Sequence, residues 1–193
     1  MSLEILYIVF YSYLLGSLPF GLILTKTFLN KDLRNIGSGN IGATNVLRTG
    51  KKSLGILTLI LDCLKAYIVV TATNKFFSDY VFLSALLCFL GHIFPVWLKF
   101  NGGKGVAVFL GVLFALSINY ALLFIVCWTI ILILTKYSSL SSLITTGVIF
   151  LYSVYVNISS ESIFFFIILV LIIYTHRKNV IRLKNKSEDK INL

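Results

Sequence analysis

The sequence predicts an all-α membrane protein with seven transmembrane helices, its N-terminus outside the cell and its C-terminus in the cytoplasm. Three observations predict this class: the composition, the spacing of the apolar runs and the placement of the basic residues. Of the 193 residues, 58% are hydrophobic and only 12% are charged, whereas a soluble domain carries about a quarter charged residues. So little polar surface cannot cover a globule in water, and we expect one integral-membrane domain over residues 1–193.

The apolar runs give the expected helices, since a membrane helix needs about 20 predominantly apolar residues. In chain order the expected helices are 3–25, 53–73, 80–98, 106–116, 120–135, 143–156 and 163–175. The first three are clear runs. The last four are short. A polar break at 117–119 separates 106–116 from 120–135, and one at 157–162 separates 143–156 from 163–175.

The basic residues indicate the orientation, because cytoplasmic loops collect Lys and Arg. Segment 26–52 carries six of them, the tail from residue 176 carries another six, and the loops between alternate in basic charge. This alternation fits seven helices. Fusing 106–135 into one helix would place Lys136 outside, and only a second fusion would restore the pattern, which leaves five helices as the alternative. The net charge of +10 is thus mostly a topology signal, and no basic face interleaved with aromatic residues points to nucleic acid.

The first cytoplasmic loop has a composition that topology does not require. Its glycines match the spacing GxGxxG, but no strand precedes them, so a dinucleotide fold is not indicated. Glycines still allow backbone N–H groups to approach an anion closely, and an arginine fork suits a phosphate. The candidate anion-binding residues of this loop are Gly37, Ser38, Gly39, Asn40, Gly42, Thr44, Asn45 and Arg48.

A second glycine-rich segment, 91–105, precedes an apolar helix and predicts another phosphate contact at the start of that helix. Its candidate residues are Gly102, Gly103, Lys104 and Gly105. It is not an ATP-binding P-loop, because Leu98 stands where the first glycine belongs and Gly105 where Ser or Thr would bind magnesium. His92 in the same segment is either a substrate contact or a histidine satisfied at the membrane interface.

Two further features lie near these loops. Four serines at 138–142 mark a third cytoplasmic edge, and Ser142 is a candidate ligand, although capping the next helix is the commoner role for a single serine. Asp62 and Lys65 lie three residues apart on one helical face inside the membrane. Because a lone charge there is costly, we expect them to form an ion pair that faces the bundle interior.

At these positions the sequence resembles the bacterial membrane glycerol-3-phosphate acyltransferases that use acyl phosphate as the acyl donor. The resemblance covers nearly the whole chain, through segments 16–21, 37–48, 62–65, 91–105 and the tail from His176. It implies a seven-helix enzyme of the inner (plasma) membrane with its active site at the cytoplasmic face. It also implies transfer of the acyl group to the sn-1 hydroxyl of glycerol 3-phosphate, which gives lysophosphatidic acid and phosphate.

The resemblance also implies residue roles. Ser38 and Arg48 correspond to catalytic residues, and the segment 102–105 corresponds to a phosphate-binding motif. The tail matches a third motif through His176, Arg177, Asn179, Arg182, Leu183 and Glu188, whereas Lys186 stands where the family usually has glycine. We expect the first loop, with Ser38, to hold the donor phosphate. Glycerol phosphate would be held by Arg48, Lys104, Ser142, His176 and Asn179. The expected partners are the two substrates and membrane lipid, with no metal and no other cofactor.

Other functional classes fit less well. A secondary transporter or anion channel, the main alternative, would place glycines and charges in broken helices near the midplane and would show repeat symmetry. Here they lie in cytoplasmic loops and no internal repeat is apparent. An alcohol phosphatidyltransferase needs clustered aspartates for metal, and the chain has only Asp32, Asp62, Asp79 and Asp189. A structural subunit would not need two anion-binding loops.

Overall fold

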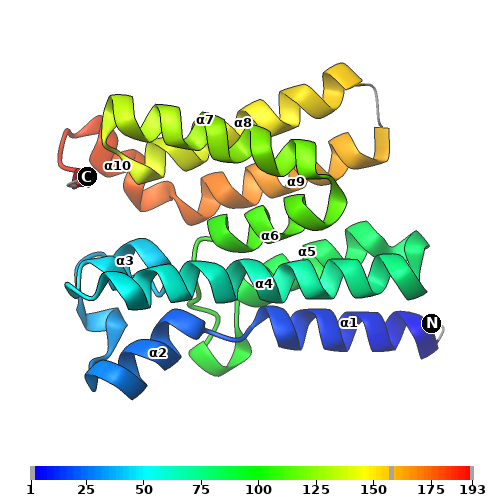
Figure 1. Ribbon diagram of the computed structural model, residues 1–193, viewed down its shortest axis with the longest axis horizontal. Helices are drawn as coiled ribbons and strands as arrows, with labels where there is room; N and C mark the ends of the chain where they lie inside the picture. The colour runs from blue at the N-terminus through cyan, green and yellow to red at the C-terminus, as the bar shows by residue number, and fades with distance from the viewer. Residues whose placement is uncertain (1–2, 157–158, 192–193) are drawn as a thin grey trace. The chain divides into compact units, whose positions relative to one another are not determined.

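The computed structural model describes residues 3–156 and 159–191, and within them every regular element is a helix. The chain divides into two compact units, Met1–Leu116 and Ser117–Leu193. Each unit has its own packed helices (Figure 1), and each is described by itself.

The first unit packs its long helices side by side. Its α-helices are α1 (Leu3–Gly16), α2 (Phe20–Leu29), α3 (Ala43–Leu47), α4 (Lys52–Phe76), α5 (Val81–Ile93) and α6 (Val106–Leu116). Short 3₁₀ turns lie at Leu33–Asn35, Ser78–Tyr80 and Val96–Leu98. The most extensive helix contacts are those of α4 with α6 and of α1 with α5.

Glycines allow these helices to approach to backbone contact. A Cβ atom on Gly111 of α6 would lie 2.0 Å from the carbonyl oxygen of Cys63 in α4, and one on Gly16 of α1 would lie 2.2 Å from that of Cys88 in α5. Close approach through small residues is a usual basis of helix association in membranes, where no hydrophobic driving force acts between helices.

The run 3–25 was predicted as one membrane helix. The structure has one candidate span there, Leu3–Leu29, but its helix breaks between Gly16 and Phe20. Pro19 lies in the break and supplies no N–H for a continuous ladder of hydrogen bonds. The break exposes backbone carbonyls to distant side chains. The indole Nε1 of Trp97 donates to the carbonyl of Ser17 at 2.9 Å, and the ammonium of Lys65 donates to that of Leu18 at 2.7 Å.

The second unit contains three long helices and a short terminal one. They are α7 (Ile118–Thr135), α8 (Ser138–Val156), α9 (Ser159–Thr175) and α10 (Arg177–Lys184). Helix α8 packs against both α7 and α9 (Figure 1). In its core the ring of Tyr120 meets Tyr152 and Phe165 edge-on, and its hydroxyl donates to Glu161 at 3.1 Å.

Each of the seven predicted apolar runs contains a helix. Among the described residues, five helical stretches are long and apolar enough to cross a membrane, and α9 with α10, bent by 61°, would make a sixth. Helix α6, with 11 residues, is shorter. Helices α6 and α7 are separate, with Ser117 between them, so 106–135 is not one fused helix. The count of seven crossings and the orientation stay predictions, and of the predicted break at 157–162, residues 157 and 158 lie outside the described residues.

Helix α8 begins at Ser138, five residues before the predicted start of its run at 143. The serines at its start therefore lie within the helix and not in a loop. The hydroxyls of Ser141 and Ser142 donate to the carbonyls of Tyr137 and Ser138 at 2.9 Å each. Such back-bonding satisfies a polar side chain inside a helix, which explains why a polar segment could continue an apolar helix.

The C-terminus of α10 shows why a glycine would suit position 186, where the resemblance implies one. The N–H of Ser187 donates to the carbonyl of Arg182 at 2.8 Å, and the N–H of Lys186 donates to that of Leu183 at 3.1 Å. These two bonds form a Schellman motif, which places the residue after the C-cap in the left-handed region. Lys186 has a φ of 56°, so the motif is kept here although the residue is not glycine.

The substitution Lys186→Gly is therefore expected to stabilise the protein. Glycine adopts positive φ without the Cβ clash that costs other residues about 1 kcal/mol. The expected result is a higher unfolding temperature of the purified protein in detergent. The matched control is Lys184→Gly at the last residue of α10, whose φ is not positive, so glycine there should not raise the unfolding temperature. A lower unfolding temperature for Lys186→Gly would contradict the assignment.

Candidate active site

The first glycine-rich loop has an apolar core of its own. The buried residues of this core are Leu22, Leu33, Ile41 and Val46, and the half-buried Ile36, Leu54 and Leu98 pack against them. Leu98 belongs to the second glycine-rich segment. The two segments therefore lie against each other in the first unit, as a shared binding site for two phosphates requires.

Asn45 holds the first loop in shape. Its side chain is 2% exposed, and its amide nitrogen donates to the carbonyls of Leu33, Ile36 and Asn40 at 3.2, 2.8 and 2.8 Å. Its amide oxygen accepts from the N–H of Ser38 at 3.1 Å. Both polar groups of Asn45 thus serve the loop itself, and the structure points to a positioning role in place of the predicted substrate contact.

The two predicted catalytic residues are neighbours at the surface of this loop. Ser38 and Arg48 are both exposed. A Cβ atom on Gly37 would lie 2.9 Å from Cδ and 3.2 Å from Nη1 of Arg48, so the arginine stem lies against the backbone next to Ser38. Gly37 and Gly39 have φ values of 53° and 71°, which glycine adopts at no steric cost. A guanidinium, a hydroxyl and bare backbone meet here, and such a set can receive a phosphate.

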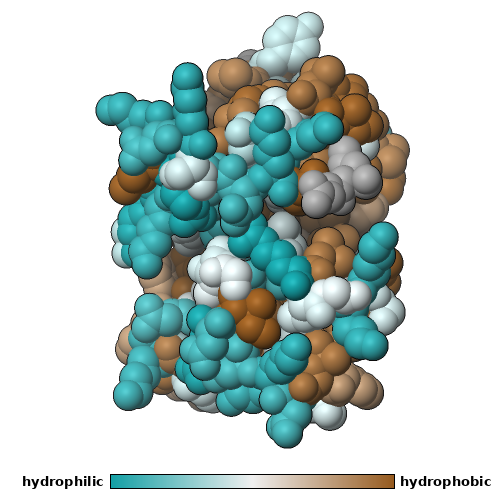
Figure 2. All heavy atoms as spheres, turned by 90° about the vertical axis from the view of Figure 1, so that its left-hand side faces the viewer, coloured by the Kyte–Doolittle hydropathy of each residue, from teal (hydrophilic) through white to brown (hydrophobic). Residues whose placement is uncertain are grey.

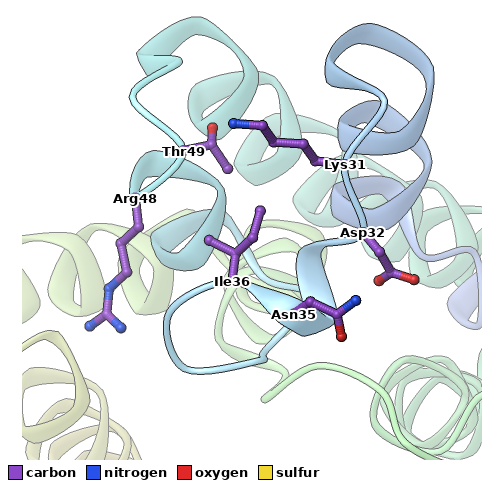
Figure 3. A pocket seen from close by; sticks show the side chains of 6 residues that line it. All are labelled: Lys31, Asp32, Asn35, Ile36, Arg48 and Thr49. Carbon is purple, nitrogen blue, oxygen red and sulfur yellow. The ribbon is translucent and has the colours of Figure 1, made fainter.

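A pocket of about 350 Å³ borders the same loop. It is lined by Lys31, Asp32, Asn35, Ile36, Arg48 and Thr49. Lys31 and Thr49 point toward each other, whereas the guanidinium of Arg48 points away from both (Figure 3). The hydrogen bond from the Arg34 guanidinium, at 2.6 Å, lowers the pKa of Asp32 far below its usual range. Asp32 is therefore ionised and paired, and the surrounding end of the first unit is strongly hydrophilic (Figure 2).

The second segment folds back over the end of α5. The N–H of Gly102 donates to the carbonyl of Ile93, and that of Gly103 donates to the carbonyl of His92, each at 3.1 Å. A Cβ atom on Gly102 would lie 2.1 Å from the His92 carbonyl oxygen, and one on Gly103 would lie 2.1 Å from His92 Nε2. These two glycines thus serve close packing, and their amides are already bonded. A phosphate contact of these two glycines stays a prediction.

The half-buried Lys104 and the buried Gly105 follow directly and lead into α6. Gly105 has a φ of 88°, and a Cβ atom there would lie 2.3 Å from the ring of Phe89. The backbone turn at 102–105 therefore fixes where Lys104 emerges, at the start of α6. Lys104 therefore lies at the start of α6, where the sequence predicted a cation, and Gly102 and Gly103 beside it serve close packing.

The expected intramembrane ion pair is confirmed. Lys65 Nζ lies 2.8 Å from Asp62 Oδ1, with both side chains buried. The same ammonium lies 3.0 Å from Nδ1 of His92, whose side chain is 4% exposed. Of the two roles left open for His92, the structure favours the histidine that is satisfied by a partner inside the protein.

In the second unit two candidate residues, Asn179 and Glu188, meet in one cluster. Its Oε1 accepts from Asn179 Nδ2 at 2.5 Å and from Ser139 Oγ at 2.8 Å, and its Oε2 accepts from Arg182 Nε at 2.6 Å. The carboxylate thereby joins the tail to α10 and to the start of α8. Sequence reasoning did not single out Ser139 from the serine run, because its partner lies 49 residues away.

The other two candidates of this unit are buried. His176 is 2% exposed, and its Nδ1–H donates to the carbonyl of Ile172 at 2.9 Å. Ser142 is not the cap of a helix. Its hydroxyl donates to the carbonyl of Ser138 and accepts from the indole Nε1 of Trp128 at 3.1 Å, so it lies in the helix packing.

Glu188 is expected to make stability depend on pH. Burial acts to raise its pKa, but the hydrogen bonds from Asn179, Ser139 and Arg182 outweigh burial, and the pKa falls below its ordinary value of 4.5. A carboxyl with a lowered pKa in the folded state adds stability above the unfolded pKa, and this stability is lost as pH falls through the folded pKa. The unfolding temperature of Glu188→Gln should therefore lie below that of the native chain near neutral pH.

The difference between the two unfolding temperatures should shrink once the pH falls below 4.5. The variant Asp189→Asn is the matched control, since it removes a neighbouring carboxylate. A difference between Glu188→Gln and the native chain that stays constant across this range would contradict the role of the ionised carboxylate.

Comparisons with known proteins agree with this architecture. The profile of the family described as Glycerol-3-phosphate acyltransferase matches residues 6–186. The glycerol-3-phosphate acyltransferase of Pelagibacter ubique (strain HTCC1062) is 54% identical over 188 residues, which is 97% of this chain and 98% of that protein. That of Ehrlichia canis (strain Jake) is 48% identical over 183 residues, covering 93% and 95%.

Two solved structures are similar as well. Both are crystal structures of PlsY (YgiH), an integral membrane glycerol 3-phosphate acyltransferase. The glycerol 3-phosphate form aligns with a TM-score of 0.92 at 39% identity, and the lysophosphatidic acid form aligns with 0.89 at 38%. Each alignment covers 97% of this chain and 95% of that one. With a family match that includes both glycine-rich segments and nearly all of the tail motif, the chain belongs to the glycerol-3-phosphate acyltransferase family.

Proposed function

We propose that this membrane enzyme transfers a fatty acyl group from acyl phosphate to the sn-1 hydroxyl of glycerol 3-phosphate. The products are lysophosphatidic acid and inorganic phosphate, which makes this the first step of phospholipid synthesis. The observation that carries the proposal is the contact between the two glycine-rich segments. It joins the loop that carries Ser38 and Arg48 to the segment that carries Lys104. The related structures with glycerol 3-phosphate and lysophosphatidic acid support it.

The reaction requires two anions to lie close together. The acceptor hydroxyl attacks the carbonyl carbon of the acyl phosphate, the bond from that carbon to the phosphate oxygen breaks, and phosphate leaves. Two phosphates repel each other unless cations and N–H dipoles are already in place. Catalysis by positioning and charge stabilisation is sufficient here, and the hydroxyl proton passes to a substrate phosphate. Asp62 is paired with Lys65 and does not act as the base.

We assign the first loop, with Ser38, to the donor phosphate. Arg48 and Lys104 are assigned to glycerol phosphate. Asn45 and the glycines 102 and 103 are assigned to holding these groups in place, because their polar groups are bonded within the protein. Ser142, His176, Asn179 and Glu188 are assigned to ordering the second unit for the same reason. The 193 residues act as a single domain with seven crossings in the plasma membrane, and the site faces the cytoplasm.

The test is product formation by the purified protein in detergent. Synthetic acyl phosphate and glycerol 3-phosphate should give lysophosphatidic acid and an equal amount of phosphate, with a chelator present. An acyl thioester is the alternative donor in a parallel reaction, and product from the thioester alone would overturn the donor assignment. Uptake of glycerol 3-phosphate into proteoliposomes without any product would favour the transporter alternative.

A further inference from the structure

A buried ammonium joins the second glycine-rich segment to the break between α1 and α2. Lys65, in the middle of α4, is 6% exposed. Its Nζ contacts three groups: Asp62 Oδ1 at 2.8 Å, His92 Nδ1 at 3.0 Å and the carbonyl of Leu18 at 2.7 Å. The contacts with His92 and Leu18 are hydrogen bonds, and the contact with Asp62 is an ion pair. Asp62 compensates the charge, and the other two contacts lead to other elements.

One contact leads to the second segment. The imidazole of His92, held by Lys65 through Nδ1, lies with its Nε2 at the place where a side chain on Gly103 would begin. The main chain of the same histidine accepts from the N–H of Gly103. The position of the ring therefore sets how closely the turn at 102–105 approaches α5, and with it the position of Lys104.

The other contact leads to the first segment. Leu18 lies in the break between α1 and α2, and the centroid of the Phe20 ring, at the start of α2, lies 5.6 Å from the ammonium. Helix α2 touches the first loop by backbone contact, since a Cβ atom on Gly21 would lie 2.0 Å from the carbonyl oxygen of Ile41. A shift of the break would therefore move the loop that carries Ser38.

A contribution to stability alone does not explain why the ammonium of this buried ion pair also contacts His92 and Leu18. Replacing a buried pair with apolar residues of similar size is often neutral for stability, and charges inside membranes generally mark function. We propose that Lys65 is a positioning residue, whose ammonium fixes the distance between the two glycine-rich segments. This inference rests on the proposed function, because it assigns the two phosphates to those segments.

The experiment uses a double variant that removes the charges as a pair, Asp62→Asn with Lys65→Met, so that no lone charge is left buried. Hydrogen exchange, followed by mass spectrometry, is measured over residues 101–106 and 36–48 together with steady-state kinetics. We expect faster exchange in both segments, and a KM for glycerol 3-phosphate raised by roughly tenfold to a hundredfold because small misplacements are costly. The matched control is Glu161→Gln, a buried carboxyl of the second unit, which should leave these exchange rates and this KM as in the native chain.

Native exchange rates and a native KM in a folded double variant would overturn the proposal, because Lys65 would then be only the partner of Asp62. If the double variant does not fold, His92→Leu provides the second test, since it keeps the ion pair and removes the link to residues 102–105. Faster exchange there supports the proposal, and native exchange overturns it. A native chain without acyl transfer would refute the proposed function alone, because the exchange rates still decide whether Lys65 orders the two segments.

Discussion

Arg48→Ala is expected to lower kcat/KM for acyl transfer by about a hundredfold or more, the usual cost of removing a charge-stabilising group in an active site. The arginine lies against Gly37, beside Ser38, and extends an exposed guanidinium from a loop whose shape Asn45 fixes. Alanine at this position removes the guanidinium and leaves the buried contacts of the loop intact. The unfolding temperature should therefore change little, while initial rates of lysophosphatidic acid formation fall.

Arg34→Ala is the matched control, because Arg34 is an exposed arginine of the same segment whose partner is Asp32. Exposed ion pairs contribute little to stability, so this variant should keep both its fold and its rate. Ser38→Ala should follow Arg48→Ala. Near-native rates for both Ser38→Ala and Arg48→Ala would remove the first loop from the catalytic site.

Gly102→Ala is the second change with a large expected effect. Its Cβ atom would lie 2.1 Å from the carbonyl oxygen of His92 and 2.8 Å from that of Ile93. Both contacts are with backbone, so the turn at 102–105 has to move as a whole. Overpacking of this kind costs roughly 1–3 kcal/mol, and the displaced Lys104 should lower kcat/KM for glycerol 3-phosphate at least about tenfold.

Gly147→Ala in α8 provides the comparison, because no atom lies within 4 Å of the Cβ position there. Alanine also favours a helix over glycine, so Gly147→Ala should be neutral or slightly stabilising. Thermal unfolding and kinetics of both variants separate a local clash from a general intolerance of glycine replacement. Equal unfolding temperatures and equal kcat/KM values for Gly102→Ala and Gly147→Ala would contradict the packing role of Gly102.

Much of this fold is predictable from local sequence. The apolar runs place the helices because hydrophobic length decides where a chain can lie in a bilayer. The spacing of Asp62 and Lys65 predicts their ion pair for a similar reason, since i and i+3 share one helical face. Pro19 indicated the break in the first run, but the apolar residues on both sides of it made the run look like one continuous helix.

The contacts of the candidate site were less predictable, because they join residues that are distant in the chain. Nothing in the local sequence distinguishes Asn45 from its polar neighbours, yet its side chain makes the hydrogen bonds that hold the loop together. The glycines 102 and 103 were predicted to bind an anion, whereas the return of the chain over α5 occupies their amides. Such roles follow from tertiary packing, on which the spacing of residues in the sequence carries no information.

The placement of the two tryptophans makes them suitable intrinsic fluorescence probes of this enzyme. Trp97 bonds to the break between α1 and α2, and Trp128 bonds to Ser142, so each compact unit contains one indole. Trp128→Phe would leave a single native fluorophore between the first helix and the second glycine-rich segment. Its emission could follow substrate addition at that place in real time, without any attached dye.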